Sequence, residues 1–120
     1  MYNMNCNIEF KGIAPQKDIQ KLIQELITRL EKRTKGFSPD VLYLRLMVEE
    51  NPARALYHVS ITLTLPEKTL ATKEERHDLH ETLRDAFAEI ERQVEAHKAT
   101  LRAEPMWKRR ARREELRKRG

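Results

Sequence analysis

The sequence predicts an α+β protein, a two-layer sandwich in the order β-α-β-β-β-α with two helices packed on one face of a four-stranded sheet. In several short segments, apolar and polar residues alternate at a period of two, which is typical of strands with one buried face. In two longer segments, apolar residues recur at three- and four-residue spacing, which is typical of helices with one buried stripe. Two such helices laid on one sheet bury all the apolar faces together.

The first strand and the first helix come before Gly36. Cys6, Ile8 and Phe10 alternate with polar residues, and the alternation ends near Gly12. Pro15 suits the first turn of a helix, because the amide proton that proline lacks has no partner there anyway. The predicted buried stripe of this helix consists of Ile19, Leu22, Ile23, Leu26, Ile27 and Leu30.

Three more strands are predicted between residues 42 and 73. Two carry clear alternation, with apolar faces formed by Leu42, Leu44, Leu46 and Val48 and then by Tyr57, Val59, Ile61, Leu63 and Leu65. The segment Asn51-Pro52-Ala53-Arg54 separates them, and Pro66-Glu67-Lys68 indicates a hairpin to a weaker fourth strand around residues 69–73. The opposite sheet face is predicted to be polar and open to solvent or to a partner; it carries Arg45, His58, Ser60, Thr62 and Thr64.

A long second helix is predicted to begin near residues 76–78, with Asp78 at its N-terminal end. Its apolar stripe consists of Leu79, Leu83, Ala86, Phe87, Ile90, Val94 and Leu101. Pro105 is expected to interrupt or kink this helix. Beyond it, residues 108–120 have few apolar anchors, so we expect either an exposed helix or a tail that a partner orders.

Length and composition indicate one folded domain in a reducing compartment. A chain of 120 residues holds one core but not two ordinary domains. Cys6 has no partner for a disulfide and is expected to act as a small buried residue in its strand. The start of the chain has no basic and apolar pattern of a secretory signal, and no apolar run approaches the ~20 residues that span a bilayer. We therefore expect a soluble, cytoplasmic protein that is a monomer.

The positive charge is concentrated at the C-terminus. The formal net charge is +5, and 8 of the 24 basic residues lie between Lys108 and Arg119, opposed only by Glu114 and Glu115. Residues 1–107 then carry a net charge of −1. We accordingly divide the chain into an α+β domain over residues 1–104 and a basic tail over residues 105–120.

The sequence offers no convergent set of catalytic residues. Its three glycines form no phosphate-binding loop, and Cys6 lacks the surroundings of a catalytic thiol. His77 and His80 would supply two metal ligands, whereas zinc normally takes three or four. Neighbouring carboxylates such as Glu74 and Glu75 are typical of solvated surface. We therefore expect no enzyme activity, no metal, no cofactor and no small-molecule substrate.

The arginine-rich run suits RNA. Guanidinium groups make forked hydrogen bonds to phosphate and stack on exposed bases. The candidate RNA-binding residues of the tail are Lys108, Arg109, Arg110, Arg112 and Arg113. Arg92, Lys98 and Arg102 on the second helix and Arg29, Lys32, Arg33 and Lys35 at the end of the first could extend that surface. The alternative for these residues of the folded domain is a solvated charged helix surface.

Two segments resemble the ribosome hibernation-promoting factor family, also called ribosome-associated inhibitor or sigma-modulation proteins. One runs from Asp78-Leu79 through Ile90-Glu91-Arg92-Gln93-Val94 to His97-Lys98, and the other is Arg29-Leu30-Glu31-Lys32. The element order is similar over roughly residues 4–102. Glu89 stands where family members often carry lysine. The chain resembles a short form, without the extra domain through which long members pair ribosomes.

The resemblance implies a non-catalytic protein that binds the small ribosomal subunit and its rRNA in the channel of messenger and transfer RNA, and so inhibits translation. It also implies that Arg29, Lys32, Arg92 and Lys98 contact rRNA. Two other functions remain open. One is a general double-stranded RNA-binding domain, because the α-β-β-β-α order is shared with such domains. The other is a protein-interaction modulator that uses the polar sheet face.

Overall fold

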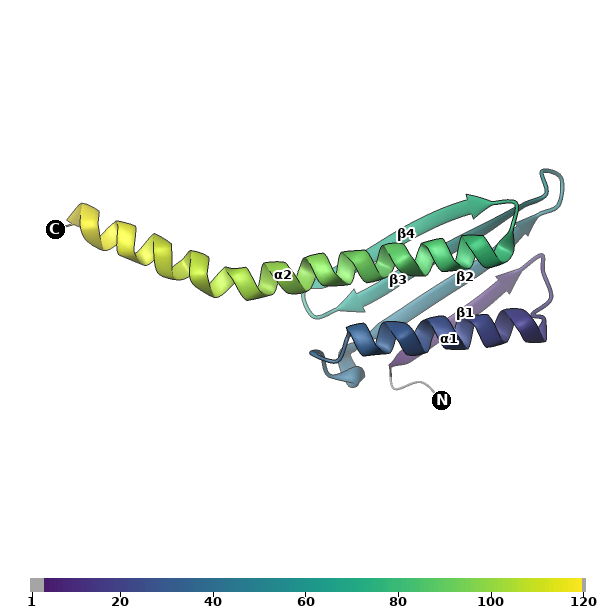
Figure 1. Cartoon of the computed structure of the whole chain (residues 1–120), viewed down its shortest axis with the longest axis horizontal. Coiled ribbons are helices and arrows are strands. Elements are labelled where there is room, and N and C mark those ends of the chain that lie inside the picture. The colour runs from purple at the N-terminus through teal and green to yellow at the C-terminus, as the bar shows by residue number, and fades with distance from the viewer. Residues whose placement is uncertain (1–3, 120) are drawn as a thin grey trace.

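The chain forms a sheet covered on one face by two helices, as the sequence predicts (Figure 1). The computed structural model describes the backbone of residues 4–119 and the side chains of residues 4–103. The elements in order are β1 (Asn5–Lys11), α1 (Lys17–Arg33), the short 3₁₀ helix η1 (Pro39–Val41), β2 (Tyr43–Asn51), β3 (Leu56–Leu65), β4 (Lys68–Arg76) and α2 (Leu79–Arg119).

The sheet is mixed, with the strands in the order β1-β2-β3-β4. β1 pairs with β2 in parallel, and the other two neighbouring pairs are antiparallel. The parallel pair follows from the length of α1, since a helix of 17 residues spans about 25 Å. That length returns the chain past the whole of β1, so β2 starts at the same end of the sheet as β1.

Tight turns at three places use backbone with a positive φ. Gly12 ends β1 at φ 69°, and a Cβ there would lie 3.3 Å from the carbonyl oxygen of Glu50. Ala55, before β3, has φ 52°, and Glu67, in the two-residue hairpin loop between β3 and β4, has φ 63°. The hairpin predicted from Pro66-Glu67-Lys68 is confirmed, and β4 extends further than the predicted residues 69–73.

Asp78 caps the start of α2, as predicted. Its Oδ1 accepts hydrogen bonds from the backbone N–H groups of His80 at 2.9 Å and Glu81 at 3.3 Å. These amides have no partner within the helix, so the carboxylate satisfies them. The helical backbone continues without interruption through Pro105 to Arg119, beyond the edge of the sheet (Figure 1).

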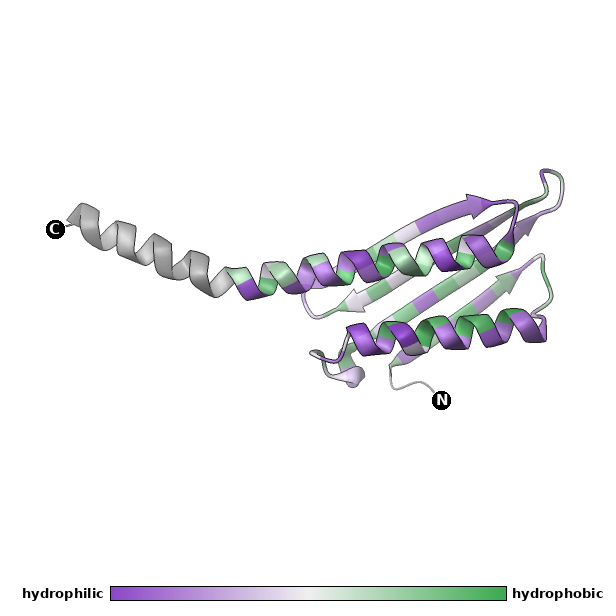
Figure 2. Cartoon of the chain, in the orientation of Figure 1, coloured by the Kyte–Doolittle hydropathy of each residue, from purple (hydrophilic) through white to green (hydrophobic). Residues whose placement is uncertain are grey.

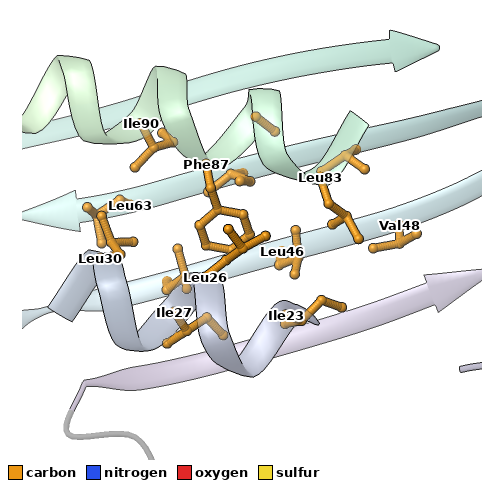
Figure 3. Packing of buried hydrophobic residues seen from close by; sticks show 14 of the residues in the cluster. Ile23, Leu26, Ile27, Leu30, Leu46, Val48, Leu63, Leu83, Phe87 and Ile90 are labelled. Atoms are coloured by element: carbon orange, nitrogen blue, oxygen red, sulfur yellow. The ribbon is translucent and has the colours of Figure 1, made fainter. Parts of the chain in front are cut away.

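The core lies between the helices and the sheet. Phe87 of α2 is fully buried and lies over Leu46 and Leu63 of the sheet and Leu26 of α1, as Figure 3 shows. All six predicted stripe residues of α1 are buried, and so are six of the seven predicted for α2. The exception is Leu101, which is 41% exposed because it follows the part of α2 that covers the sheet.

The opposite sheet face is uncovered by any element among the described residues. Tyr43, Arg45 and Thr62 lie on it in neighbouring register positions of β2 and β3. The hydropathy colouring of Figure 2 shows the polar outer surface of α1 and the apolar residues that turn toward the sheet. Among the described residues, no helix is long and apolar enough to cross a membrane.

Candidate nucleic-acid interface

Helices α1 and α2 lie side by side and run in the same direction (Figure 1). Contacts between them follow the same order along both helices. Near their starts, His80 Nε2 lies 3.4 Å from Asp18 Oδ2, and eleven residues further along each helix Arg29 pairs with Glu91. The parallel arrangement brings basic residues at the C-terminal end of α1 against the middle of α2.

Acidic residues of α2 hold arginines of α1 at this seam. Arg29 Nε donates to Glu91 Oε1 at 2.8 Å, and Glu91 is only 13% exposed. One turn further, Arg33 Nη1 lies 3.8 Å from Glu95 Oε1. The four-residue spacing is the same on both helices, so each turn of α1 meets one acid of α2.

Lys98 closes the seam at the C-terminal end of α1. Its Nζ donates to the backbone carbonyl oxygen of Arg33 at 2.8 Å and lies 3.6 Å from Glu95 Oε1. The last carbonyls of a helix have no partner within it and carry partial negative charge, so an ammonium group there is favourable. Arg102, one turn beyond Lys98, is exposed, and its Nε donates to the Lys98 carbonyl oxygen at 3.4 Å.

We call the basic residues of this region the seam cluster. It consists of Arg29, Lys32, Arg33, Lys98 and Arg102. Lys32 is exposed one turn along α1 from Arg29. The pairs of the cluster are open to solvent, with Arg29 and Arg33 each 52% exposed. Exposed ion pairs contribute little net stability, so a phosphate can replace a carboxylate partner at small cost.

Arg92 lies on the other flank of α2. Its Nε and Nη2 donate to the two carboxylate oxygens of Glu89 at 2.9 and 2.6 Å. Gln93, beside it, donates from Nε2 to Glu89 and to the carbonyl oxygen of Ala71 in β4, which fixes this flank as the one facing β4. The hydrogen bonds from Arg92 and then Gln93 lower the pKa of Glu89 to about 2.

The structure thus divides the predicted RNA-binding residues. The seam brings together four of them, Arg29, Lys32, Lys98 and Arg102. Arg92 lies on the opposite flank of α2 and pairs with Glu89. The side chains of the five predicted tail residues lie outside the described part of the chain. Sequence reasoning missed the partner role of Glu91 and Glu95. Their four-residue spacing, opposite that of Arg29 and Arg33, is the signal that would have indicated it.

The residues weighed for catalysis or metal binding take structural roles. His77 Nδ1 lies 2.9 Å from the carbonyl oxygen of Ala55, and His80 lies between Asp18 and Asp78. Cys6 is half-buried, and burial, with a smaller contribution from the charge of Glu31, raises the pKa of its thiol to about 11. Within residues 4–103 no three histidine, cysteine or acidic side chains cluster as metal ligands would.

The fold and the seam define a small α+β protein whose two parallel helices bring five cations together at one seam. The family model for the sigma 54 modulation protein / S30EA ribosomal protein matches residues 6–102. The chain therefore belongs to this family of ribosome-associated, non-enzymatic proteins, the family that its sequence resembles. No curated protein matches the chain in sequence.

Solved structures share the fold. The N-terminal domain of Protein Y from Thermus thermophilus superposes with a TM-score of 0.64 at 18% identity, covering 78% of this chain and 99% of that domain. A ribosomal subunit interface protein from Coxiella burnetii gives a TM-score of 0.60 at 19% identity, covering 80% of this chain and 99% of that protein. At this identity the likeness concerns the fold.

Proposed function

We propose that this protein is a cytoplasmic translation inhibitor that binds the small ribosomal subunit as a monomer and occupies the channel of messenger and transfer RNA. Membership of a ribosome-associated family supports a ribosomal partner. One of the similar structures is itself named a ribosomal subunit interface protein. Inhibition would come from occupancy alone, so the proposal requires no bond to be made or broken.

The seam cluster is the observation that carries the proposal. Five cations lie along the contact between the two helices, on the side that faces away from the sheet. A nucleic-acid backbone has access to them there. Glu91 and Glu95 position three of them, Arg29, Arg33 and Lys98, so less conformational entropy is lost when these three meet phosphate. Arg92 would contact rRNA from the other flank of α2.

The proposal gives residues 105–120 a separate role as a basic tail. Eight positive charges between Lys108 and Arg119 repel one another and gain from contact with a polyanion. The candidate contacts there are Lys108, Arg109, Arg110, Arg112 and Arg113. Removing residues 105–120 should leave the folded domain able to bind small subunits with a shallower dependence on salt.

Sedimentation with purified small subunits at several salt concentrations tests the proposal. We expect binding at low salt that weakens by a slope of roughly 0.7–0.9 in log–log form for each phosphate neutralised. Lys32→Glu with Arg102→Glu should reduce binding, because both cations are exposed and neither pairs with a carboxylate among the described residues. Subunits already filled with messenger and transfer RNA should exclude the protein.

A matched control uses Lys11→Glu with Lys73→Glu, two exposed cations on the uncovered sheet face. This pair changes the net charge equally and should leave binding unchanged. Loss of binding only in this control pair would instead favour a protein-interaction modulator that uses the sheet face. Equal competition by any RNA duplex would favour a general double-stranded RNA binder, and absence of wild-type binding at low salt would refute the proposal.

A further inference from the structure

A polar groove, separate from the seam cluster, lies on the flank of α2 that faces away from α1. It runs between the start of β4 and the middle of α2 and is lined mainly by Lys68, Arg92, Gln93, Ala96 and Thr100. Of these residues, only Arg92 belongs to the predicted RNA-binding set. The buried side chain of Leu70 and the half-buried ring of His97 complete its lining, so the groove has both polar and apolar walls.

Lys68 supplies an available positive charge at this groove. It stands two residues before Leu70 in β4, and side chains two apart on a strand share a face, so Lys68 projects on the side of the helices. It is exposed, and among the described side chains no carboxylate pairs with it. Its ammonium group and the guanidinium of Arg92 give the groove two cations.

Gln93 turns a hydrogen-bond acceptor toward solvent. Its Nε2 donates to the carbonyl oxygen of Ala71 at 3.1 Å and to Glu89 Oε1 at 3.1 Å. The reversed amide would place oxygen against two acceptors, so the orientation is fixed by chemistry. The amide oxygen Oε1 has no donor among the described residues and can accept a hydrogen bond from a ligand.

Thr100 adds a second acceptor on the same flank, two turns further along α2. Its hydroxyl donates to the carbonyl oxygen of Ala96 at 3.1 Å. That bond uses the only hydrogen that the hydroxyl has, so its oxygen faces the groove as an acceptor. The groove therefore combines cations for phosphate with two acceptors that require a donor from the ligand.

We propose that this groove binds the sugar-phosphate backbone of RNA, with Lys68 and Arg92 at phosphates and Gln93 and Thr100 accepting from ribose 2′-hydroxyls. The 2′-hydroxyl is a donor that DNA lacks, so the groove favours RNA over DNA of the same sequence. The inference rests on the proposed function in that it extends the rRNA contact from the seam cluster to the opposite flank of α2.

Two lysines of one strand give a matched test with the full-length protein. Lys68→Gln removes the groove cation, whereas Lys73→Gln removes an exposed cation from the uncovered face of the same strand. Binding to purified small subunits is measured against monovalent salt. We expect Lys68→Gln to flatten the salt slope by roughly 0.7–0.9 and weaken binding about tenfold at ~0.05 M salt, and Lys73→Gln to match wild type.

A second arm uses a single-stranded 12-nucleotide RNA and the DNA of the same sequence, with fluorescence anisotropy. Thr100→Val keeps the side-chain shape but removes the acceptor, so it should reduce the preference for RNA while DNA binding stays constant.

Small-subunit binding that is equal for Lys68→Gln and Lys73→Gln would overturn the proposed RNA binding by the groove and leave the proposed function intact. If the wild-type protein does not bind small subunits, the proposed function fails, and the oligonucleotide measurement alone tests the groove. An RNA preference that depends on Thr100 then supports RNA binding by the groove, whereas equal binding of RNA and DNA overturns it.

Discussion

Replacing Glu89 with glutamine should strengthen binding to the small ribosomal subunit. Glu89 takes both donors of the Arg92 guanidinium, at 2.9 and 2.6 Å, and so occupies the geometry that a phosphate would use. Its pKa is lowered to about 2, so the carboxylate is charged at any pH at which ribosomes are intact. Glutamine keeps the size of the side chain and removes the charge.

The expected gain corresponds to a full phosphate contact by Arg92 in place of one for which Glu89 competes. Arg92 is 68% exposed, so solvent and a polyanion reach it without rearrangement of the core. An arginine freed from its carboxylate should steepen the salt slope by up to roughly 0.7–0.9, which gives a gain in affinity of up to about tenfold at ~0.05 M monovalent salt. The gain should vanish near 1 M salt, because counterion release then contributes nothing.

Equilibrium binding to purified small subunits at four or more salt concentrations measures both quantities. Glu49→Gln is the control, because Glu49 is an exposed acid on the uncovered sheet face and its loss changes the net charge equally. A gain shared by both variants would mean that net charge alone acts. A salt slope of Glu89→Gln equal to that of wild type would refute the assignment of Arg92 as a phosphate contact restrained by Glu89.

Two further predictions concern the fold. Phe87→Ala should lower the free energy of unfolding by about 3–5 kcal/mol, because Phe87 is fully buried between both helices and the sheet. Urea denaturation measures this free energy, and a loss below about 1 kcal/mol would contradict the packing. Asp78→Ala should cost about 1 kcal/mol through loss of the α2 cap, whereas Asp78→Asn, which retains an acceptor, should cost much less in the same assay.

The element order was predictable because burial imposes its period on the sequence. The alternation through Val59, Ile61 and Leu63 and the stripe through Leu83 and Phe87 each correspond to an observed buried face. The parallel pairing of β1 with β2 was not predicted, since period alone carries no information on strand direction. The extent of β4 was underestimated because the edge strand ends in charged residues, where alternation in hydropathy disappears.

Of the two outcomes expected at Pro105, an interruption of α2 is wrong, whereas the helix does change direction where it extends beyond the sheet (Figure 1). Proline cannot donate the hydrogen bond of a helix interior, and that local cost was taken as a reason for α2 to end or bend. The backbone remains helical through this position to Arg119. Local propensity gives a cost for each residue, whereas helix length is set by the sum over many favourable neighbours, here a segment rich in arginine, lysine, glutamate and alanine.

The cations of the site were predictable as a set but not as an arrangement. Arg29 and Lys98 are separated by 69 positions in the chain, and only the parallel contact of the helices brings them to one seam. A sequence also cannot reveal which cations are engaged. Arg92 was interpreted as an extension of one continuous positive surface, whereas the structure places it on the opposite flank and binds it to Glu89.

The distribution of charge indicates that the folded domain and the basic tail would affect the association rate to different extents. Residues 1–107 carry a net charge of −1, because the acids that position the seam cations also cancel them at long range. Such a body attracts RNA only at contact distance, where phosphate can replace carboxylate. The tail has few acids, so its field extends about a Debye length, ~8 Å at physiological salt. Under the proposed function, deletion of residues 105–120, which carry 8 basic and 2 acidic residues, should therefore lower the association rate much more than Lys32→Gln with Arg102→Gln, which removes only two charges. Stopped-flow measurements with labelled small subunits separate the two, and equal effects of both changes on the association rate would show that body and tail act as one electrostatic surface.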